Sequence, residues 1–154
     1  ALRTGAAADA EAADMDAAAA GAGDDELAAA YVSELLRYDS PVQLTTRICF
    51  EDVERDGVLM PAGAGVFLAL GAANRDPLRF PAPDRFDPTR PQNQPLSFGA
   101  GPHFCLGAAL ARLEAQIAFP MLLRGLPRLA LAEEPRYRSR LTLRGYRAVP
   151  VTVS

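Results

Sequence analysis

The chain has 154 residues, of which 49% are hydrophobic and 23% are charged, and its formal net charge is −3. This length suits one folded unit, and so weak a charge gives no reason to expect a nucleic acid partner. No apolar run approaches the ~20 residues of a membrane-spanning helix. Cys49 and Cys105 cannot build a disulfide framework, and with a single histidine they are too few for a tetrahedral zinc site. These cysteines and the lack of a visible secretory signal at residue 1 favour a cytoplasmic protein.

The first 25 residues are of low complexity. Half of residues 1–30 are alanine, and glycine and aspartate fill most of the remainder. Because almost no large side chain is available for burial, we expect residues 1–25 to be disordered. Residues 26–154 are expected to form the folded part of the chain.

A helix is predicted from Asp24, because acidic residues suit a helix N-terminus and apolar residues then recur on one face. It must end near Tyr38, since a proline follows at position 41. Strand-like runs at 43–50, 58–60 and 65–70 predict a small antiparallel sheet, with residues 51–57 as a connection. A short helical turn is expected around residues 72–75.

Residues 77–102 hold seven of the 13 prolines and show little periodicity. So long an irregular segment is expected in a compact domain only where it serves a function. The apolar spacing after it predicts a helix from Leu106, with a kink or an early end at Pro120, which lacks a backbone N–H. The last thirty residues alternate weakly and predict short strands around a turn at Arg144-Gly145.

The most informative run is FGAGPHFCLG, residues 98–107. It places Cys105 where a glycine-rich loop meets the start of a helix. Free backbone N–H groups and the positive end of the helix dipole favour a thiolate at such a position. A lone cysteine is more often a buried structural residue, so the thiol alone does not decide between the two interpretations.

The run resembles the haem-binding loop of the cytochrome P450 family, Phe-x-x-Gly-x-x-x-Cys-x-Gly. Phe98, Gly101, Cys105 and Gly107 match this pattern in full. The resemblance extends over about residues 26–154 and is greatest to soluble bacterial members. It implies the C-terminal part of a mainly α-helical fold. This part is expected to be α+β: a helix with Glu-x-x-Arg, a small antiparallel sheet, a proline-rich meander, the cysteine loop, a long helix and short C-terminal strands.

The resemblance implies that the chain binds haem b and that Cys105 is the fifth ligand of its iron. Thiolate ligation pushes electron density onto the iron and favours cleavage of the O–O bond. Gly101 and Gly107 are expected to let the backbone approach the macrocycle, and Phe98 to shield the sulfur. No further catalytic residue is expected in this chain.

Two cationic residues are implied to contact the haem propionates. His103 lies two residues before the cysteine, and Arg47 lies in a predicted strand. Guanidinium groups suit carboxylates because they donate two parallel hydrogen bonds. Without the resemblance, His103 would be an ordinary polar loop residue and Arg47 a solvated strand residue.

Other charged residues take structural or docking roles from the same resemblance. Glu34 and Arg37 lie three apart on the first helix, and Arg85 in the meander is expected to join them in a buried network. Alone, such a helix pair is commonplace. Arg112 is expected on the surface where an electron donor docks, although a solvated helix position is an equal alternative.

The implied reaction inserts one oxygen atom from O₂ into a small lipophilic substrate. Electrons come from NAD(P)H through a ferredoxin or flavodoxin-like donor, and a monomer is expected. The family's long helix, whose acid and threonine deliver protons to bound oxygen, has no counterpart in this chain. Two alternatives therefore stay open: a non-catalytic haem-binding module, and a truncated inactive remnant. Whether this chain alone is active stays open as well.

Overall fold

The computed structural model describes residues 24–153. The disorder expected for residues 1–25 therefore falls outside the described residues, except that Asp24 and Asp25 form the first turn of a helix. Among the helices in this described range, none is both long and apolar enough to cross a membrane.

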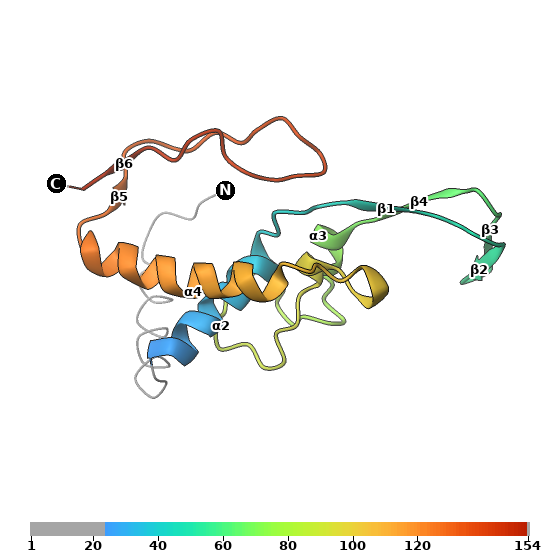
Figure 1. Cartoon of the computed structure of the whole chain (residues 1–154), viewed down its shortest axis with the longest axis horizontal. Coiled ribbons are helices and arrows are strands. Elements are labelled where there is room, and N and C mark those ends of the chain that lie inside the picture. Colours follow the sequence, from blue (N-terminus) through green and yellow to red (C-terminus); the bar gives the residue numbers. More distant parts are fainter. Residues whose placement is uncertain (1–23, 154) are drawn as a thin grey trace.

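Two long helices form the body of the molecule. Helix α2 (Asp24–Tyr38) crosses and packs against α4 (Ala108–Gly125), as Figure 1 shows. The acidic first turn of α2 and Arg37 in its last turn both complement the helix dipole. The bounds predicted for this helix are confirmed.

Two antiparallel strand pairs project from the helices as one ribbon (Figure 1). Strand β1 (Thr45–Ile48) pairs with β4 (Gly65–Leu68), and β2 (Val53–Arg55) pairs with β3 (Val58–Met60) at the far end of the ribbon. Residues 51–57 were predicted to be only a connection, which was wrong, because β2 lies within them. The two residues between β2 and β3, Asp56 and Gly57, have φ angles of 51° and 77°, as the tightest hairpin turns require.

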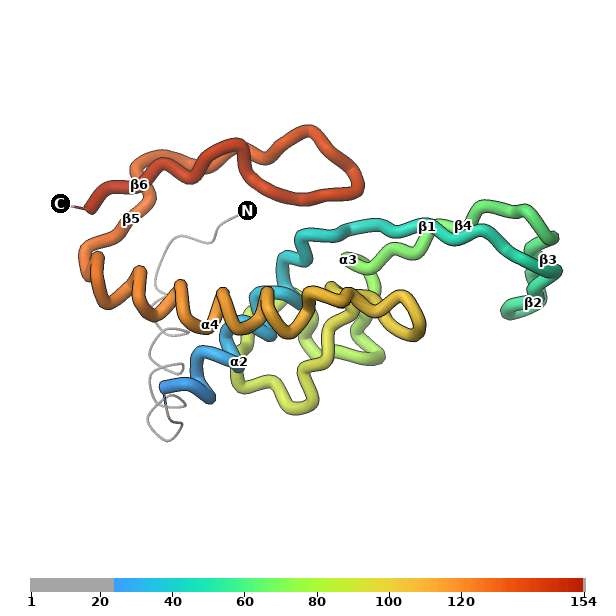
Figure 2. The backbone as a smooth tube through the Cα atoms, in the orientation of Figure 1, coloured from blue at the N-terminus to red at the C-terminus, as the bar shows by residue number. Residues whose placement is uncertain are grey.

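The proline-rich segment is largely irregular, as expected. It follows the short helix α3 (Leu70–Ala73), and its end contains the 3₁₀ helices η1 (Leu96–Phe98) and η2 (Gly101–His103). Residues 74–95, which we call the meander, contain neither helix nor strand. Figure 2 shows this stretch looping beside α2, so its path has to be fixed by contacts other than its own regular structure.

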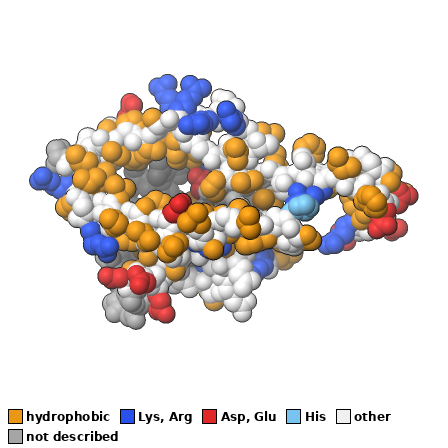
Figure 3. All heavy atoms as spheres, viewed as in Figure 1, with side chains coloured by type: hydrophobic (Ala, Val, Ile, Leu, Met, Phe, Trp, Pro, Cys, Tyr) orange, Lys and Arg blue, Asp and Glu red, His pale blue; other side chains and the backbone are white. Residues whose placement is uncertain are grey.

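Helix α4 does not end at Pro120. It continues to Gly125, and the N–H of Leu126 still donates to the carbonyl of Leu122 at 2.9 Å. Proline therefore removes one hydrogen bond without ending the helix, and the early end offered in the prediction was wrong. Hydrophobic side chains lie exposed over the region of α4 in Figure 3. Leu110 and Leu113 are among the exposed apolar residues of this helix.

The C-terminal residues form a long antiparallel excursion over α4 (Figure 2). Strand β5 (Ala130–Leu131) pairs with β6 (Val151–Thr152), and an isolated bridge joins Tyr137 to Tyr146. A second bridge joins Val42 to Leu143 and ties the turn of this excursion to the segment after α2.

The interior between α2 and the meander is polar. The four largest fully buried side chains among the described residues are those of Arg37, Glu34, Asn74 and Ser40. The buried aliphatic and aromatic side chains of the described residues are those of Val32, Leu70, Phe80 and Ala108, and the centre of the Phe80 ring lies 5.4 Å from the guanidinium carbon of Arg37. Since buried charge is costly unless it is paired, the bonds of this cluster determine how firmly the meander is held.

Candidate functional site

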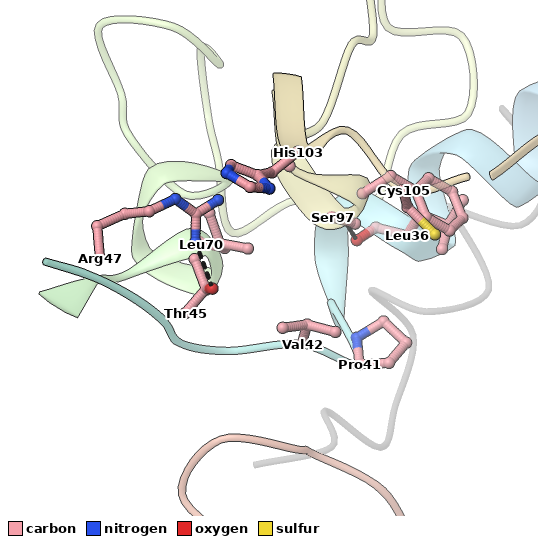
Figure 4. A pocket seen from close by; sticks show the side chains of 11 residues that line it. Leu36, Pro41, Val42, Thr45, Arg47, Leu70, Ser97, His103 and Cys105 are labelled. Carbon is pink, nitrogen blue, oxygen red and sulfur yellow. Dashed lines mark hydrogen bonds between the residues drawn. The ribbon is translucent and has the colours of Figure 1, made fainter. Parts of the chain in front are cut away.

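A cavity of about 280 Å³ lies between the end of α2, β1, the start of α3 and the cysteine loop. Four of the residues selected from the sequence line it, namely Arg47, Phe98, His103 and Cys105. The rest of the lining is mostly apolar and includes Leu36, Pro41, Val42 and Leu70. Figure 4 shows Arg47 and His103 on one side of this cavity and Cys105 on the other.

The cysteine loop is a folded turn that presents its thiol. The N–H of Cys105 donates to the carbonyl of Phe98 at 2.9 Å, and this bond closes the loop around η2. Helix α4 begins three residues after the cysteine, and Gly107 is its N-cap. Cys105 is exposed, so the interpretation of a buried structural cysteine does not hold.

Glycine is required in the loop by backbone conformation. Gly99 and Gly101 have φ angles of 72° and 69°, a region that side chains with a Cβ rarely adopt. Gly101 was selected from the sequence but does not line the cavity, whereas Gly99 lines it and was not selected. A Cβ at Gly107 would lie 3.9 Å from the sulfur of Cys105.

Arg47 is oriented by its own strand. Its Nη1 donates to the Oγ1 of Thr45 at 3.2 Å and to the carbonyl of Thr46 at 2.8 Å. Thr45 and Arg47 lie two apart in β1 and both line the cavity. The guanidinium is therefore held at the cavity wall, with further donors available for an anionic group.

The predicted pair of Glu34 and Arg37 is present as a fully buried, bidentate ion pair. The Nε and Nη2 of Arg37 each donate to one carboxylate oxygen of Glu34 at 2.7 Å. The remaining three N–H groups of Arg37 donate to the carbonyls of Asn74, Pro83 and Arg85 at 2.9–3.0 Å. All five donors of this guanidinium are thus used, and three of them hold the meander.

The second arginine of the cluster is Arg90, and the prediction of Arg85 was wrong in this respect. Arg85 has an exposed side chain and contributes its carbonyl. Arg90 is buried, with Nε 3.6 Å from a carboxylate oxygen of Glu34. Its Nη1 donates to the carbonyl of Pro81, and its Nη2 donates to those of Ala82 and Arg85.

Glu34 also accepts hydrogen bonds from the meander. The backbone N–H of Asp87 and the side-chain amide of Asn93 each donate to it at 2.8 Å. Burial alone would raise the pKa of the Asp87 carboxyl, but hydrogen bonds donated by Thr89 and the charges of two arginines lower that pKa overall. The carboxylate on which the bonds of the meander converge is that of Glu34.

A smaller buried contact joins α3 to the start of the cysteine loop. The amide of Asn74 donates to the hydroxyl of Ser97 at 2.9 Å, and its oxygen accepts from the N–H of Leu96 at 2.7 Å. The hydroxyl of Ser97 in turn donates to the carbonyl of Leu36 in α2. No periodicity marks either residue in the sequence, so this contact became visible only in the structure.

Arg112 is partly buried. Its Nη1 lies 3.3 Å from the hydroxyl of Ser33 in α2, and its guanidinium carbon lies 5.2 Å from the centre of the Phe98 ring. The residue predicted to face an electron donor thus also contacts the ring beside the cysteine.

The site combines a single exposed thiol, an apolar wall, and a guanidinium and an imidazole on the opposite side. No group of three or more His, Cys, Asp or Glu residues that could hold a metal ion occurs within the described range 24–153. The thiol at the cavity wall is that of Cys105, which could supply one bond to a metal whose remaining ligands belong to another group. A flat apolar metal complex with carboxylate substituents fits that arrangement.

Comparison with known proteins gives the same family as the cysteine loop. Residues 26–128 match the family model described as cytochrome P450. The chain is 53% identical over 122 residues to a biotin biosynthesis cytochrome P450 of Bacillus subtilis, covering 79% of this chain and 31% of that protein. It is 47% identical over 123 residues to 6-deoxyerythronolide B hydroxylase of Saccharopolyspora erythraea, covering 78% and 30%.

Solved structures show the same fold. P450BioI in complex with an acyl carrier protein ligated to hexadec-9Z-enoic acid superposes with a TM-score of 0.81 at 51% identity, covering 84% of this chain and 34% of that one. CYP109E1 from Bacillus megaterium, bound to testosterone, gives a TM-score of 0.79 at 36% identity, covering 83% and 36%. The chain spans about a third of the length of the curated relatives it matches. By its cysteine loop, its fold and these matches, the chain belongs to the cytochrome P450 family, whose members are monooxygenases.

Proposed function

We propose that this chain forms the haem-thiolate site of a bacterial cytochrome P450 monooxygenase. The observation that carries the proposal is the position of Cys105, exposed at the wall of an apolar cavity that it shares with Phe98, Arg47 and His103. When bound, haem b supplies the oxygen activation through which such enzymes insert one atom of O₂ into a substrate.

Each residue of the site has a role in binding that group. Cys105 would supply the thiolate ligand, and Phe98 and the apolar lining would flank the bound group beside the sulfur. Arg47 and His103 hold the propionates, which a guanidinium already fixed at the cavity wall can accept without losing much side-chain freedom. A Cβ at Gly101 would meet nothing within 4 Å, and one at Gly107 would lie against the sulfur of Cys105, so both glycines would leave room for the macrocycle.

The cluster around Glu34 supports the site and takes no part in the chemistry. Glu34, Arg37 and Arg90 fix the meander against α2, and the meander leads into the cysteine loop. The site depends on this cluster because residues 74–95 contain no regular structure that could hold them in place.

The substrate we propose is small and lipophilic. Two solved relatives hold hexadec-9Z-enoic acid on its carrier protein and testosterone, both lipophilic. We further propose that NAD(P)H supplies the electrons through a ferredoxin or flavodoxin-like donor that docks where Arg112 lies on α4. A cytoplasmic monomer suits this role.

The test is the carbon monoxide difference spectrum of the purified chain after addition of haemin and reduction. We expect a strongly red-shifted Soret band that disappears in Cys105→Ala. The matched control is Cys49→Ala, which removes the other thiol, partly buried beside β1, and should leave the band unchanged. Absence of the band in the unmodified chain, or its persistence in Cys105→Ala, would refute the proposed site.

A further inference from the structure

Arg112 has two contacts inside the molecule, and together they connect three elements. Arg112 lies in the second turn of α4. Its Nη1 lies within hydrogen-bond distance of the hydroxyl of Ser33 in α2, and its guanidinium lies over the ring of Phe98 in η1. A side chain that served only as a docking charge would extend into solvent. That of Arg112 is partly buried between the two helices and the cysteine loop.

The ring of Phe98 is the part of the loop on which this contact acts. Phe98 lines the cavity with Cys105, and its carbonyl accepts the N–H of Cys105 at 2.9 Å. The ring also contacts that of Phe104 edge-on, at 6.5 Å between centroids. A cation at 5.2 Å from the ring centre is within the range of a favourable cation–π interaction.

We infer that Arg112 is a positioning residue, which holds the Phe98 ring beside the sulfur of Cys105 and places one positive charge behind it. The contact with Ser33 anchors the guanidinium to α2, one residue before the buried carboxylate of Glu34. The inference rests on the proposed haem-thiolate site and adds an internal role to the docking role of Arg112.

The charge of Arg112 would change the reduction potential of a metal bound to Cys105 in a defined direction. A positive charge near a thiolate ligand stabilises the electron-richer state of the metal it binds, so it raises the reduction potential. Loss of Arg112 should therefore shift the haem potential to more negative values. If the effect acts through the ring, it should depend on Phe98.

The first experiment needs no haem. Unfolding by urea is measured for the full chain, for Phe98→Leu, for Arg112→Met, and for the double variant. We expect the unfolding equilibrium constants to show a coupling of about two- to fivefold between the two positions, as a cation–π contact predicts. The same cycle with Phe98→Tyr, which keeps the ring face, should give nearly additive effects and is the control; Phe98→Met replaces Phe98→Leu if that variant fails to fold. Additive effects in the cycle that removes the ring would overturn the inference.

The second experiment uses the haem-loaded chain without any electron donor. Arg112→Met should lower the midpoint potential when Phe98 is present and change it less in Phe98→Leu. The control is Arg124→Met, which removes an exposed arginine from the last turn of the same helix and should leave the potential unchanged. An unchanged potential in Arg112→Met, with weaker donor binding, would mean that Arg112 only docks the donor and would overturn the inference. If the unmodified chain binds no haem, the proposed function fails, while the urea cycle still decides the contact.

Discussion

Removal of the Glu34 carboxylate should strongly disrupt the support of the site. Glu34→Ala deletes the partner of two buried guanidinium groups, those of Arg37 and Arg90. It also deletes four hydrogen bonds to the carboxylate, two from Arg37 and one each from Asp87 and Asn93.

The expected loss follows from the burial of the cluster. Both side chains of the Glu34–Arg37 pair have 0% exposure. Breaking such a pair leaves an uncompensated charge, at a cost of about 3–5 kcal/mol. A domain of this size has a total unfolding free energy of about 5–15 kcal/mol. The variant should therefore lose about a fifth or more of the stability of the chain, and we expect it to lose haem incorporation as well.

The assay is urea unfolding followed by circular dichroism, with haem content measured in parallel. Glu26→Ala is a suitable control, because it removes an exposed carboxylate from the first turn of the same helix and should cost only a few tenths of a kcal/mol. An unfolding free energy of Glu34→Ala within about 1 kcal/mol of the unmodified chain, a loss typical of many ordinary substitutions, would refute the reasoning. So would normal haem content in that variant.

Three further predictions concern the meander and the C-terminal excursion. Arg90→Met should destabilise the chain by about 1–3 kcal/mol in urea unfolding, since it removes a buried cation beside Glu34 and the donor to the carbonyls of Pro81 and Ala82, whereas Arg85→Met should have little effect because that side chain is exposed. The lowered pKa of Asp87 means that its stabilising contribution is present above its ordinary pKa of 3.8 and is lost as the pH falls through the lower value of the folded state. The unfolding free energy of the unmodified chain should therefore exceed that of Asp87→Asn at neutral pH, and the difference should disappear at low pH. A difference that persists at low pH would contradict this prediction. A hydrogen bond with Tyr137 and burial raise the pKa of Tyr146 to about 12, so its contribution should be complete below pH ~10, its unfolded value, and lost as the pH approaches 12. The stability difference from Tyr146→Phe should shrink over that interval, and a constant difference would count against the pairing.

Local signals in the sequence were sufficient for much of the fold. The acidic start of α2 and the proline at position 41 determined both ends of that helix. Strand β2 was not predicted because Val53–Arg55 has a single apolar residue and all three residues are exposed, so it shows neither a buried run nor clear alternation. The Asp56-Gly57 pair was the available signal, since this dipeptide favours a two-residue hairpin turn. Helix α4 continues beyond Pro120 because a proline removes only the hydrogen bond of its own missing N–H. The next turn still forms its backbone hydrogen bonds, such as that from the N–H of Leu126 to the carbonyl of Leu122.

The site was predictable where residue type and spacing decide the chemistry, and less so where the chain path decides it. The cysteine loop gave Phe98, His103 and Cys105, which the structure brings to one cavity with Arg47. The choice between Arg85 and Arg90 could not be made in this way. Both lie in an irregular segment without a period, so nothing in the sequence indicates which side chain turns inward.

The bonds of Arg37 to the meander have a consequence for sequence drift. The three groups that it binds there are carbonyls, those of Asn74, Pro83 and Arg85, which every amino acid possesses. The contacts of Arg37 thus depend on the path of the backbone and not on which side chains occupy positions 83 and 85. Substitutions at these two positions can accumulate without loss of the contact, provided that the backbone keeps its course. A change in segment length would displace the carbonyls together, so insertions and deletions, rather than substitutions, are the changes that this part of the protein tolerates least.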